Sequence, residues 1–385
     1  MDIELPAALI SASIVTYWIR TSVIAFGAWR ERRTTARVLP SSELPFVSII
    51  IPARNEEHRI KRCLESLISV DYPPSKLEII VVNDRSTDRT GEVIAAYADR
   101  IPSLRVLTLH HPRTGNLQGK AGALDAGIAH AQGEIILLTD ADCAVHPQWV
   151  RSHVSLYSDP DVVMVCGYTL IDGQRLFDRY QAVEWNATHT MASAGVHYRQ
   201  YLGCYGNNMS IRRRVYQQLG GYAAIPFSVT EDLALLQAVG NTGKTIRYLC
   251  SQQSTVVTEP CRTIAEYLQQ HQRWVHGARA LRWRAYLFVA TTVIYWLGLL
   301  TALVRAEWVW VAGILGARMG ADVLLNAPAL MLLNRKHLIA WIIPTTVLFS
   351  MLELTLPLLA LSRSIEWKDQ VFITVPSRPR TASSP

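Results

Sequence analysis

The sequence predicts an α/β fold, a Rossmann-like mixed and mostly parallel sheet, with transmembrane helices at both ends. Between about residues 45 and 140, short apolar runs alternate with segments whose apolar residues recur at helical spacing. That alternation is typical of a parallel sheet with helices on both faces. Long apolar segments lie near the N-terminus and after about residue 285. With half of its residues hydrophobic and 18% charged, the chain is too apolar for an ordinary soluble protein.

The first apolar segment, Leu5–Trp29, predicts a membrane anchor, either a span or an interfacial helix. It lacks the basic start of a cleavable signal peptide. Arg20 lies inside it, and this residue must either snorkel to the surface or pair with an acid of another helix. Four arginines follow the segment: Arg30, Arg32, Arg33 and Arg37. Under the positive-inside rule they place the next domain in the cytoplasm, and this explains the net charge of +7 better than nucleic-acid binding does.

Three more apolar segments predict a C-terminal bundle: Tyr286–Val304, Trp308–Leu333 and Leu338–Leu361. A second group of cations precedes them: Arg273, Arg279, Arg282 and Arg284. Within the bundle, Arg318 and Asp322 are four residues apart and are expected to pair. Three spans after a cytoplasmic domain would put the tail outside, although the tail is basic: Arg363, Lys368, Arg378 and Arg380. A re-entrant segment is the alternative, so the number of spans stays open.

The middle of the chain contains the elements of the predicted sheet. The expected strands are Phe46–Ile51, Leu77–Val82, Leu104–Leu109 and Glu134–Thr139, and the expected helices are Glu57–Ser69 and Ala121–Ala131. In such sheets ligands bind beyond the carboxyl ends of the strands. Polar residues follow three of these strands: Arg54, Asn55 and Glu56; Asn83, Asp84, Arg85 and Ser86; and Asp140 and Asp142.

Asp140 and Asp142 are the candidate metal ligands. Two residues apart in extended backbone, they would point the same way. Carboxylates suit Mg2+ or Mn2+ shared with a diphosphate. A turn or a helix cap is the alternative for such a pair, and the position at a strand end favours the metal.

Lys120 is the candidate contact for a diphosphate. The segment Gly115–Ala121 is not a phosphate loop of the Walker type, because its glycine spacing is one residue short and Ala121 replaces the metal-binding hydroxyl. Lys120 still begins a predicted helix, where backbone N–H groups and an ammonium favour an anion. Plain solvent exposure is the alternative.

Two later motifs add acid–base and cationic groups. Thr230-Glu-Asp232 opens an apolar helix, either as a helix cap or with Asp232 as a general base. Gln270, Arg273 and Trp274 lie in an amphipathic stretch from 262 to 284, which predicts a helix at the membrane surface. The arginine can neutralise a leaving diphosphate, and the tryptophan can stack on a sugar ring.

Together these motifs resemble the membrane-bound glycosyltransferases of family two, which have the GT-A fold. The resemblance covers about residues 45 to 274. The matching segments, in order, are Val47–Glu56, Val82–Asp88, Gly119–Leu124, Asp140–Asp142, Gly206–Met209 with Arg212, Thr230–Asp232 and Gln270–Trp274.

The resemblance implies a role for each motif. The first loop, with Pro52, Arg54 and Glu56, belongs to the donor side. Asp84 would contact uracil, Lys120 the diphosphate, and Asp140 the ribose or the metal. Asp142 would bind Mg2+ or Mn2+, and Asp232 would be the catalytic base. Gln270, Arg273 and Trp274 would close over the donor phosphates and the acceptor. An in-line displacement with inversion would then convert an α-linked UDP-sugar into a β-glycoside.

The predicted organisation has five parts: an anchor (1–40), a cytoplasmic catalytic domain (41–261), an interface helix (262–284), a transmembrane bundle (285–362) and a tail (363–385). The expected partners are a UDP-sugar and a membrane lipid, in the cell membrane and without nucleic acid. A processive polysaccharide synthase is the alternative. A transporter with a nucleotide-sensing domain is more remote and would use Arg318, Asp322 and Glu353. The six scattered cysteines predict reduced thiols. The sugar, the lipid and the oligomeric state stay open.

Overall fold

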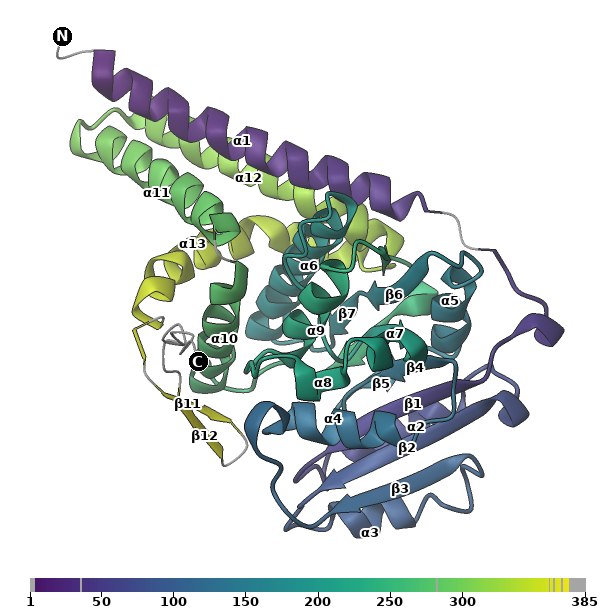
Figure 1. Ribbon diagram of the computed structural model, residues 1–385. Coiled ribbons are helices and arrows are strands. Elements are labelled where there is room, and N and C mark those ends of the chain that lie inside the picture. Colours follow the sequence, from purple (N-terminus) through teal and green to yellow (C-terminus); the bar gives the residue numbers. More distant parts are fainter. Residues whose placement is uncertain are drawn as a thin grey trace, which may run out of the picture.

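The computed structural model describes residues 4–34, 37–281, 283–359, 361–362, 364–367 and 370–373 (Figure 1). A seven-stranded sheet with the order β3-β2-β1-β4-β8-β6-β9 forms its centre. Only β8 among these strands runs antiparallel to its neighbours, β4 and β6. The predicted fold class, a mixed and mostly parallel sheet with apolar helices at both ends, is therefore confirmed. Arg282, Arg363, Lys368, Arg378 and Arg380, which entered the topology prediction, lie outside the described residues.

The strands of the large sheet include all four predicted strands, with ends that match or differ by one or two residues. They are β1 (Val47–Ala53), β2 (Leu77–Asp84), β3 (Leu104–Leu109), β4 (Ile135–Leu138), β6 (Val162–Gly167), β8 (Met209–Arg212) and β9 (Thr245–Leu249). A three-stranded sheet contains β5 (Ala144–Val145), β10 (Val256–Thr258) and β7 (Thr169–Ile171). A hairpin contains β11 (Ser364–Trp367) and β12 (Gln370–Ile373).

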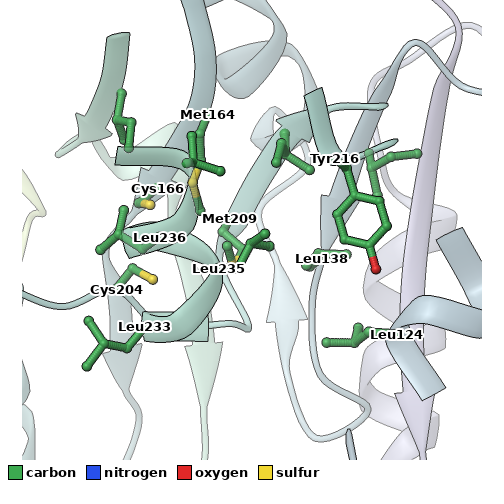
Figure 2. Packing of buried hydrophobic residues seen from close by; sticks show 14 of the residues in the cluster. Leu124, Leu138, Met164, Cys166, Cys204, Met209, Tyr216, Leu233, Leu235 and Leu236 are labelled. Atoms are coloured by element: carbon green, nitrogen blue, oxygen red, sulfur yellow. The ribbon is translucent and has the colours of Figure 1, made fainter. Parts of the chain in front are cut away.

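The large sheet is apolar on both faces, because successive residues of a strand point to opposite sides. Along β1, Ile50 packs into one core, while Ile49 and Ile51 pack into the other. The first core is covered by α4 (Lys120–Ala129), α7 (Arg213–Gln218) and α9 (Glu231–Gly240), and Figure 2 shows part of it. The second core is covered by α2 (Ile60–Ile68), α3 (Thr90–Ala95) and α5 (Trp149–Leu156).

The helix α2 begins three residues later than predicted. The N–H group of Glu56 donates to the hydroxyl of Thr90 (2.7 Å), and that of Glu57 donates to Asp88 (3.1 Å). Because these N–H groups bond to side chains of the loop after β2, residues 57–59 form a turn and not a helix. The loop after β1 is thereby fixed against the loop after β2.

The remaining helices connect the sheet to the apolar ends of the chain. They are α1 (Glu4–Arg32), α6 (Leu176–His197), α8 (Gly221–Ala224), α10 (Ile264–Ala278), α11 (Trp283–Val304), α12 (Trp308–Leu332) and α13 (Ile342–Leu359). Short 3-10 turns occur at Ser41–Glu43, Pro74–Lys76, Gly115–Leu117, Gln252–Ser254, Arg279–Leu281 and Lys336–Trp341. In Figure 1, α1, α11 and α12 project together from the sheet domain, and α10 lies between that domain and α13.

Four helical segments of the described chain are long and apolar enough to cross a membrane: Pro6–Arg32, Tyr286–Val304, Trp308–Leu332 and Lys336–Thr355. The last predicted segment differs most from its prediction, since it opens with the 3-10 turn Lys336–Trp341 and α13 ends at Leu359. One segment near the N-terminus and three near the C-terminus agree with the predicted arrangement.

Three charged side chains of α12 and α13 form ion pairs with one another. Arg318 of α12 lies 3.0 Å from Glu353 of α13 and 3.9 Å from Asp322, so the predicted pairing of Arg318 with Asp322 is confirmed. The hydroxyls of Tyr17 (2.8 Å) and Thr346 (2.7 Å) also donate to Asp322. This network joins α1, α12 and α13.

Arg20 pairs with no acid among the described residues, although such a pair was one of the two expectations for it. Its guanidinium donates to the hydroxyl of Thr291 (2.9 Å) and lies 4.4 Å from the ring centre of Tyr17. A hydroxyl and an aromatic face therefore solvate this cation. At the other end of α1, the buried Glu31 accepts a hydrogen bond from the backbone of Tyr248 in β9 (3.1 Å). The helix α1 is thus docked on the sheet domain.

Candidate active site

A cavity of about 590 Å³ lies at the carboxyl edge of the sheet, between the strand ends and α10. Its wall includes residues from the loops after β1, β2 and β4 and from the starts of α4 and α9. All eleven residues singled out from the sequence line it: Pro52, Arg54, Glu56, Asp84, Lys120, Asp140, Asp142, Asp232, Gln270, Arg273 and Trp274. The fold therefore brings together residues that are more than 200 positions apart.

The loops after β1 and β2 both line the cavity. Asp84 is buried at the end of β2, and both of its carboxylate oxygens accept from the guanidinium of Arg85 (2.7 and 2.9 Å). Asn55 and Arg85 adopt positive φ angles of 52° and 54°. Asn tolerates this region well, whereas for arginine it is uncommon. Both loops thus turn sharply as the strands end.

Asp140 and Asp142 lie in a turn. The sequence predicts extended backbone at these two residues, and this prediction is wrong. The N–H group of Cys143 donates to the carbonyl oxygen of Asp140 (3.1 Å), which closes the turn. Both carboxylates nevertheless line the cavity. The turn and the ligand interpretations are therefore compatible, because the turn holds the two side chains at the strand end.

Asp140 and Asp142 offer the hard oxygen ligands that Mg2+ and Mn2+ prefer. Within the described part of the chain, no group of three His, Cys, Asp or Glu side chains is arranged to hold a metal ion. A divalent ion at these carboxylates would need its other ligands from water or from a bound diphosphate. The residues present fit a metal that arrives with a phosphate ligand, and they do not form a closed structural site.

Lys120 is held between two acids. Its ammonium lies 2.6 Å from Asp140 and 3.2 Å from Glu231 of α9. Burial alone would lower the pKa of Lys120, but these carboxylates outweigh burial and raise the pKa above its ordinary value. The side chain is only 15% exposed, so the alternative of plain solvent exposure is wrong. The cation at this position is permanent near neutral pH.

Asp232 is the second residue of α9 and is held by two backbone donors. One oxygen accepts from the N–H group of Gly206 and the other from that of Leu233, both at 2.8 Å. Burial and the neighbouring Glu231 raise the pKa of Asp232 to about 6, against the opposing effect of Lys120. The carboxylate is therefore mostly ionised at pH 7, with a pKa suited to accepting a proton.

Thr230 occupies the N-cap position of α9, as the helix-cap alternative predicted. Its hydroxyl lies 3.1 Å from the hydroxyl of Ser228 and makes no capping bond to α9. Thr230 instead packs against Gly277 of α10, where a methyl group would overlap the Thr230 side chain. Glycine at this position allows α10 to approach the start of α9 closely.

The helix α10 supplies Gln270, Arg273 and Trp274 to the cavity. Burial lowers the pKa of Arg273, and the carboxylates of Glu231, Asp232 and Asp140 oppose this shift. The buried amide oxygen of Gln270 has no hydrogen-bond partner among the described residues. A ligand with a hydrogen-bond donor would satisfy it.

Three aromatic side chains form one wall of the cavity: Trp185, Tyr205 and Trp274. Their ring centres are 4.7 Å apart for Trp185 and Tyr205, and 5.7 Å apart for the two other pairs. Such a wall can stack on a sugar ring or contact a lipid chain. Only Trp274 was singled out from the sequence.

A buried acid behind that wall was also missed. Glu184 of α6 accepts from the Tyr267 hydroxyl (2.9 Å) and lies 2.6 Å from Nε2 of His271. The His271 ring lies 4.9 Å from the Trp274 ring. No local spacing relates Glu184 to a helix 80 residues later, so the sequence offered only the helical spacing of Tyr267, His271 and Trp274 as a signal.

Comparisons with known proteins agree with this geometry. The profile of glycosyl transferase family 2 matches residues 48–220, and that of glycosyl transferase family group 2 matches residues 135–359, more than half of the chain. A probable glycosyltransferase of Bacillus subtilis, YdaM, is 32% identical over 260 residues, which are 65% of this chain and 60% of that protein. A beta-monoglucosyldiacylglycerol synthase of Nostoc is 29% identical over 241 residues, 61% of this chain and 49% of that protein.

The fold also resembles a solved structure. The mannosyltransferase PcManGT from Pyrobaculum calidifontis, in complex with GDP-Man and Mn2+, is similar with a TM-score of 0.60 and 22% identity. The similarity covers 91% of this chain and 99% of the archaeal one. The two curated relatives are longer, and the chain spans about half to three fifths of their length.

Proposed function

The chain belongs to glycosyl transferase family group 2, and on this premise we propose that it transfers a sugar from a UDP-sugar to a hydroxyl of a membrane lipid. The reaction is an inversion that yields a β-glycoside. The observation that carries the proposal is the convergence of Asp142, Lys120 and Asp232 on one cavity. These residues supply a metal ligand, a cation for phosphate and a base, which are the three groups that such a transfer needs.

Asp232 acts as the general base. Its carboxylate accepts the proton of the acceptor hydroxyl while the hydroxyl oxygen attacks the anomeric carbon. The bond from that carbon to the diphosphate breaks, and the electron pair leaves with UDP. Because attack and departure are in line, the α-linked donor gives a β-linked product. The N–H groups of Gly206 and Leu233 hold the carboxylate in position before the reaction.

Lys120 and Arg273 stabilise the departing diphosphate, because positive charge close to a developing anion lowers the barrier. A Mg2+ or Mn2+ ion held by Asp142 and Asp140 would neutralise the same phosphates. Asp84, at the end of β2, is the proposed contact for uracil. The loop with Pro52, Arg54 and Glu56 encloses the donor from the side of β1.

A lipid acceptor is supported by the position of the cavity next to apolar helices. The helix α10 lines the cavity and packs on α13, with Tyr267 against Leu352. Since α13 belongs to a candidate membrane span, a lipid headgroup has a short path to Asp232. The similarity to a beta-monoglucosyldiacylglycerol synthase supports the same class of acceptor.

We place the protein in the cell membrane, with four spans and the catalytic domain (41–261) in the cytoplasm. The arginines after α1 support this orientation. The transporter alternative loses its main support, because Arg318, Asp322 and Glu353 pair with one another and bind the helices together.

The test uses purified full-length protein in detergent with lipid extract and labelled UDP-sugars. We expect metal-dependent release of UDP together with a labelled glycolipid, and the loss of both in Asp142→Asn and Asp232→Asn. Retained turnover in both variants would contradict the mechanism. A long saccharide polymer made from UDP-sugar alone would instead identify a processive synthase.

A further inference from the structure

We infer that the acceptor is a lipid with an uncharged hydroxyl-bearing headgroup and that the site discriminates against lipid phosphates. The inference rests on the proposed function and specifies the class of membrane lipid that accepts the sugar. Neutral headgroups of this class include glycerol and sugar hydroxyls. The charges of the cavity wall, the contacts of its cations and the chemistry of its base each support it.

The cavity wall carries an excess of negative charge. Twice as many carboxylates as cations line it. The carboxylates are Glu56, Asp84, Asp140, Asp142, Glu231, Asp232, Glu259 and Glu266, and the cations are Arg54, Arg59, Lys120 and Arg273. A divalent ion and a nucleoside diphosphate would roughly cancel each other and leave this excess in place. A second phosphate group would enter a cavity that is already acidic.

The cations near the base are already engaged by acids. Lys120 contacts Asp140 and Glu231. The carboxylates of Glu231, Asp232 and Asp140 also favour the charged form of Arg273, because they raise its pKa against the effect of burial. These two cations are the ones that a donor diphosphate would use.

On the other side of the cavity, Arg59 lies 3.9 Å from Glu56 and 3.7 Å from Glu259. Glu266 also lines the cavity, so this part of the wall carries further negative charge. A phosphate acceptor would need a cation of its own to offset its charge. Among the four cations of the described wall, Lys120, Arg273 and Arg59 are committed to carboxylates or to the donor. The fourth, Arg54, lies in the loop after β1 that we assign to the donor.

The chemistry of the base points the same way. An alcohol must lose a proton as its oxygen bonds to the anomeric carbon, and Asp232 is positioned to take that proton. A lipid phosphate is already ionised near neutral pH, so it needs no base, and its charge would face Asp232 and Glu231.

The size of the discrimination follows from Coulomb interactions at short range. Like charges about 4 Å apart repel strongly enough in a partly buried site to change an equilibrium by about 100-fold or more. We therefore expect kcat/KM for the neutral member of a matched lipid pair to exceed that for its phosphate by about 100-fold.

The first test does not require the lipid to be known. Purified protein in nanodiscs is supplied with labelled UDP-sugars and a total membrane lipid extract, and the products are separated by anion exchange. Labelled product is expected in the unbound neutral fraction and should resist mild acid, as a glycoside does. Label in the retained acidic fraction that mild acid releases would mark a glycosyl phosphate and overturn the inference.

The second test compares matched pairs, diacylglycerol with phosphatidic acid of the same chains, and a polyprenol with its phosphate. Transfer to the neutral member alone supports the inference. Transfer to the phosphate member at an equal or higher rate overturns it, while the proposed transfer to lipid stands. UDP release with no labelled lipid in either test would overturn the lipid acceptor, and the inference with it.

Discussion

The ammonium of Lys120 lies 2.6 Å from the carboxylate of Asp140, which joins the start of α4 to the turn after β4. Its second contact, to Glu231, extends the link to the helix that carries Asp232. The proposed donor site and the proposed base are therefore connected through one cation. Removal of this cation should affect both.

The first prediction is that Lys120→Gln weakens binding of UDP about 10- to 100-fold. The substitution leaves Asp140 and Glu231 without their cation, so both acids would repel the diphosphate. Calorimetric titration with UDP and Mn2+ measures the effect. Lys61→Gln, at an exposed position of α2, is the matched control and should bind UDP like the parent protein. If both variants bound UDP with the same affinity, Lys120 would not be a contact of the donor diphosphate.

The second prediction separates the metal from the base. Asp142→Asn should weaken metal-dependent UDP binding, because a carboxylate ligand becomes an amide. Asp232→Asn should keep UDP binding and lower kcat by about 10²- to 10⁴-fold, which is the usual contribution of a general base. Titration of UDP with and without EDTA, beside turnover assays, checks this asymmetry. If Asp232→Asn lost UDP binding and kept its kcat at saturation, the two roles would be reversed.

The third prediction concerns pH. The pKa of Asp232 is about 6, so the carboxylate is protonated and inactive well below that pH. The ratio kcat/KM, which follows the pKa values of the free enzyme, should therefore rise with pH through about 6 and level off above 7. Glu231→Gln removes a charge that raises this pKa, so the midpoint should move to lower pH. Lys120→Gln removes a charge that lowers it, so its midpoint should move to higher pH.

Profiles of kcat/KM against pH measure these midpoints, and profiles of kcat at saturating donor report the pKa of the same group in the bound complex. Circular dichroism at each pH controls for unfolding. A midpoint that stayed the same in both variants would show that another group limits the rate.

The fourth prediction tests the close packing of α10 on α9. In Gly277→Ala the new methyl group would overlap Thr230, so α10 must move away and carry Arg273 and Trp274 with it. We expect kcat/KM to fall about 10- to 100-fold, since small displacements of positioning groups have effects of this size. Gly316→Ala in α12 is the control, because a methyl group there meets no atom within 4 Å. A similar loss in the control would indicate a general effect on the helices.

The sequence could predict the first four strands and eleven residues of the cavity wall. Strand ends in a parallel sheet meet at one edge, and the later motifs were found through the resemblance to a known family. The sequence could not predict the backbone at Asp140, because a turn closed by Cys143 and an extended strand end carry the same acidic pattern. The partner of Arg20 was missed for another reason. A hydroxyl such as Thr291 leaves no charge signal in the sequence, although it can solvate a buried cation. The pair Glu184 and His271 depends on the packing of α6 on α10, which no local pattern encodes.

That pair gives the last prediction. Glu184 touches no predicted ligand position, but it holds His271, whose ring packs on Trp274 of the cavity wall. Glu184→Gln keeps the size of the side chain and places an amide where the Tyr267 hydroxyl and His271 now meet a carboxylate. We expect KM for the acceptor to rise about tenfold, with the affinity for UDP unchanged, because Trp274 shifts while Asp142 and Lys120 do not. A merely structural role would lower the melting temperature and reduce all parameters together. The conservative variant Glu184→Asp should restore part of the acceptor KM, and failure of both variants to change it would exclude the positioning role.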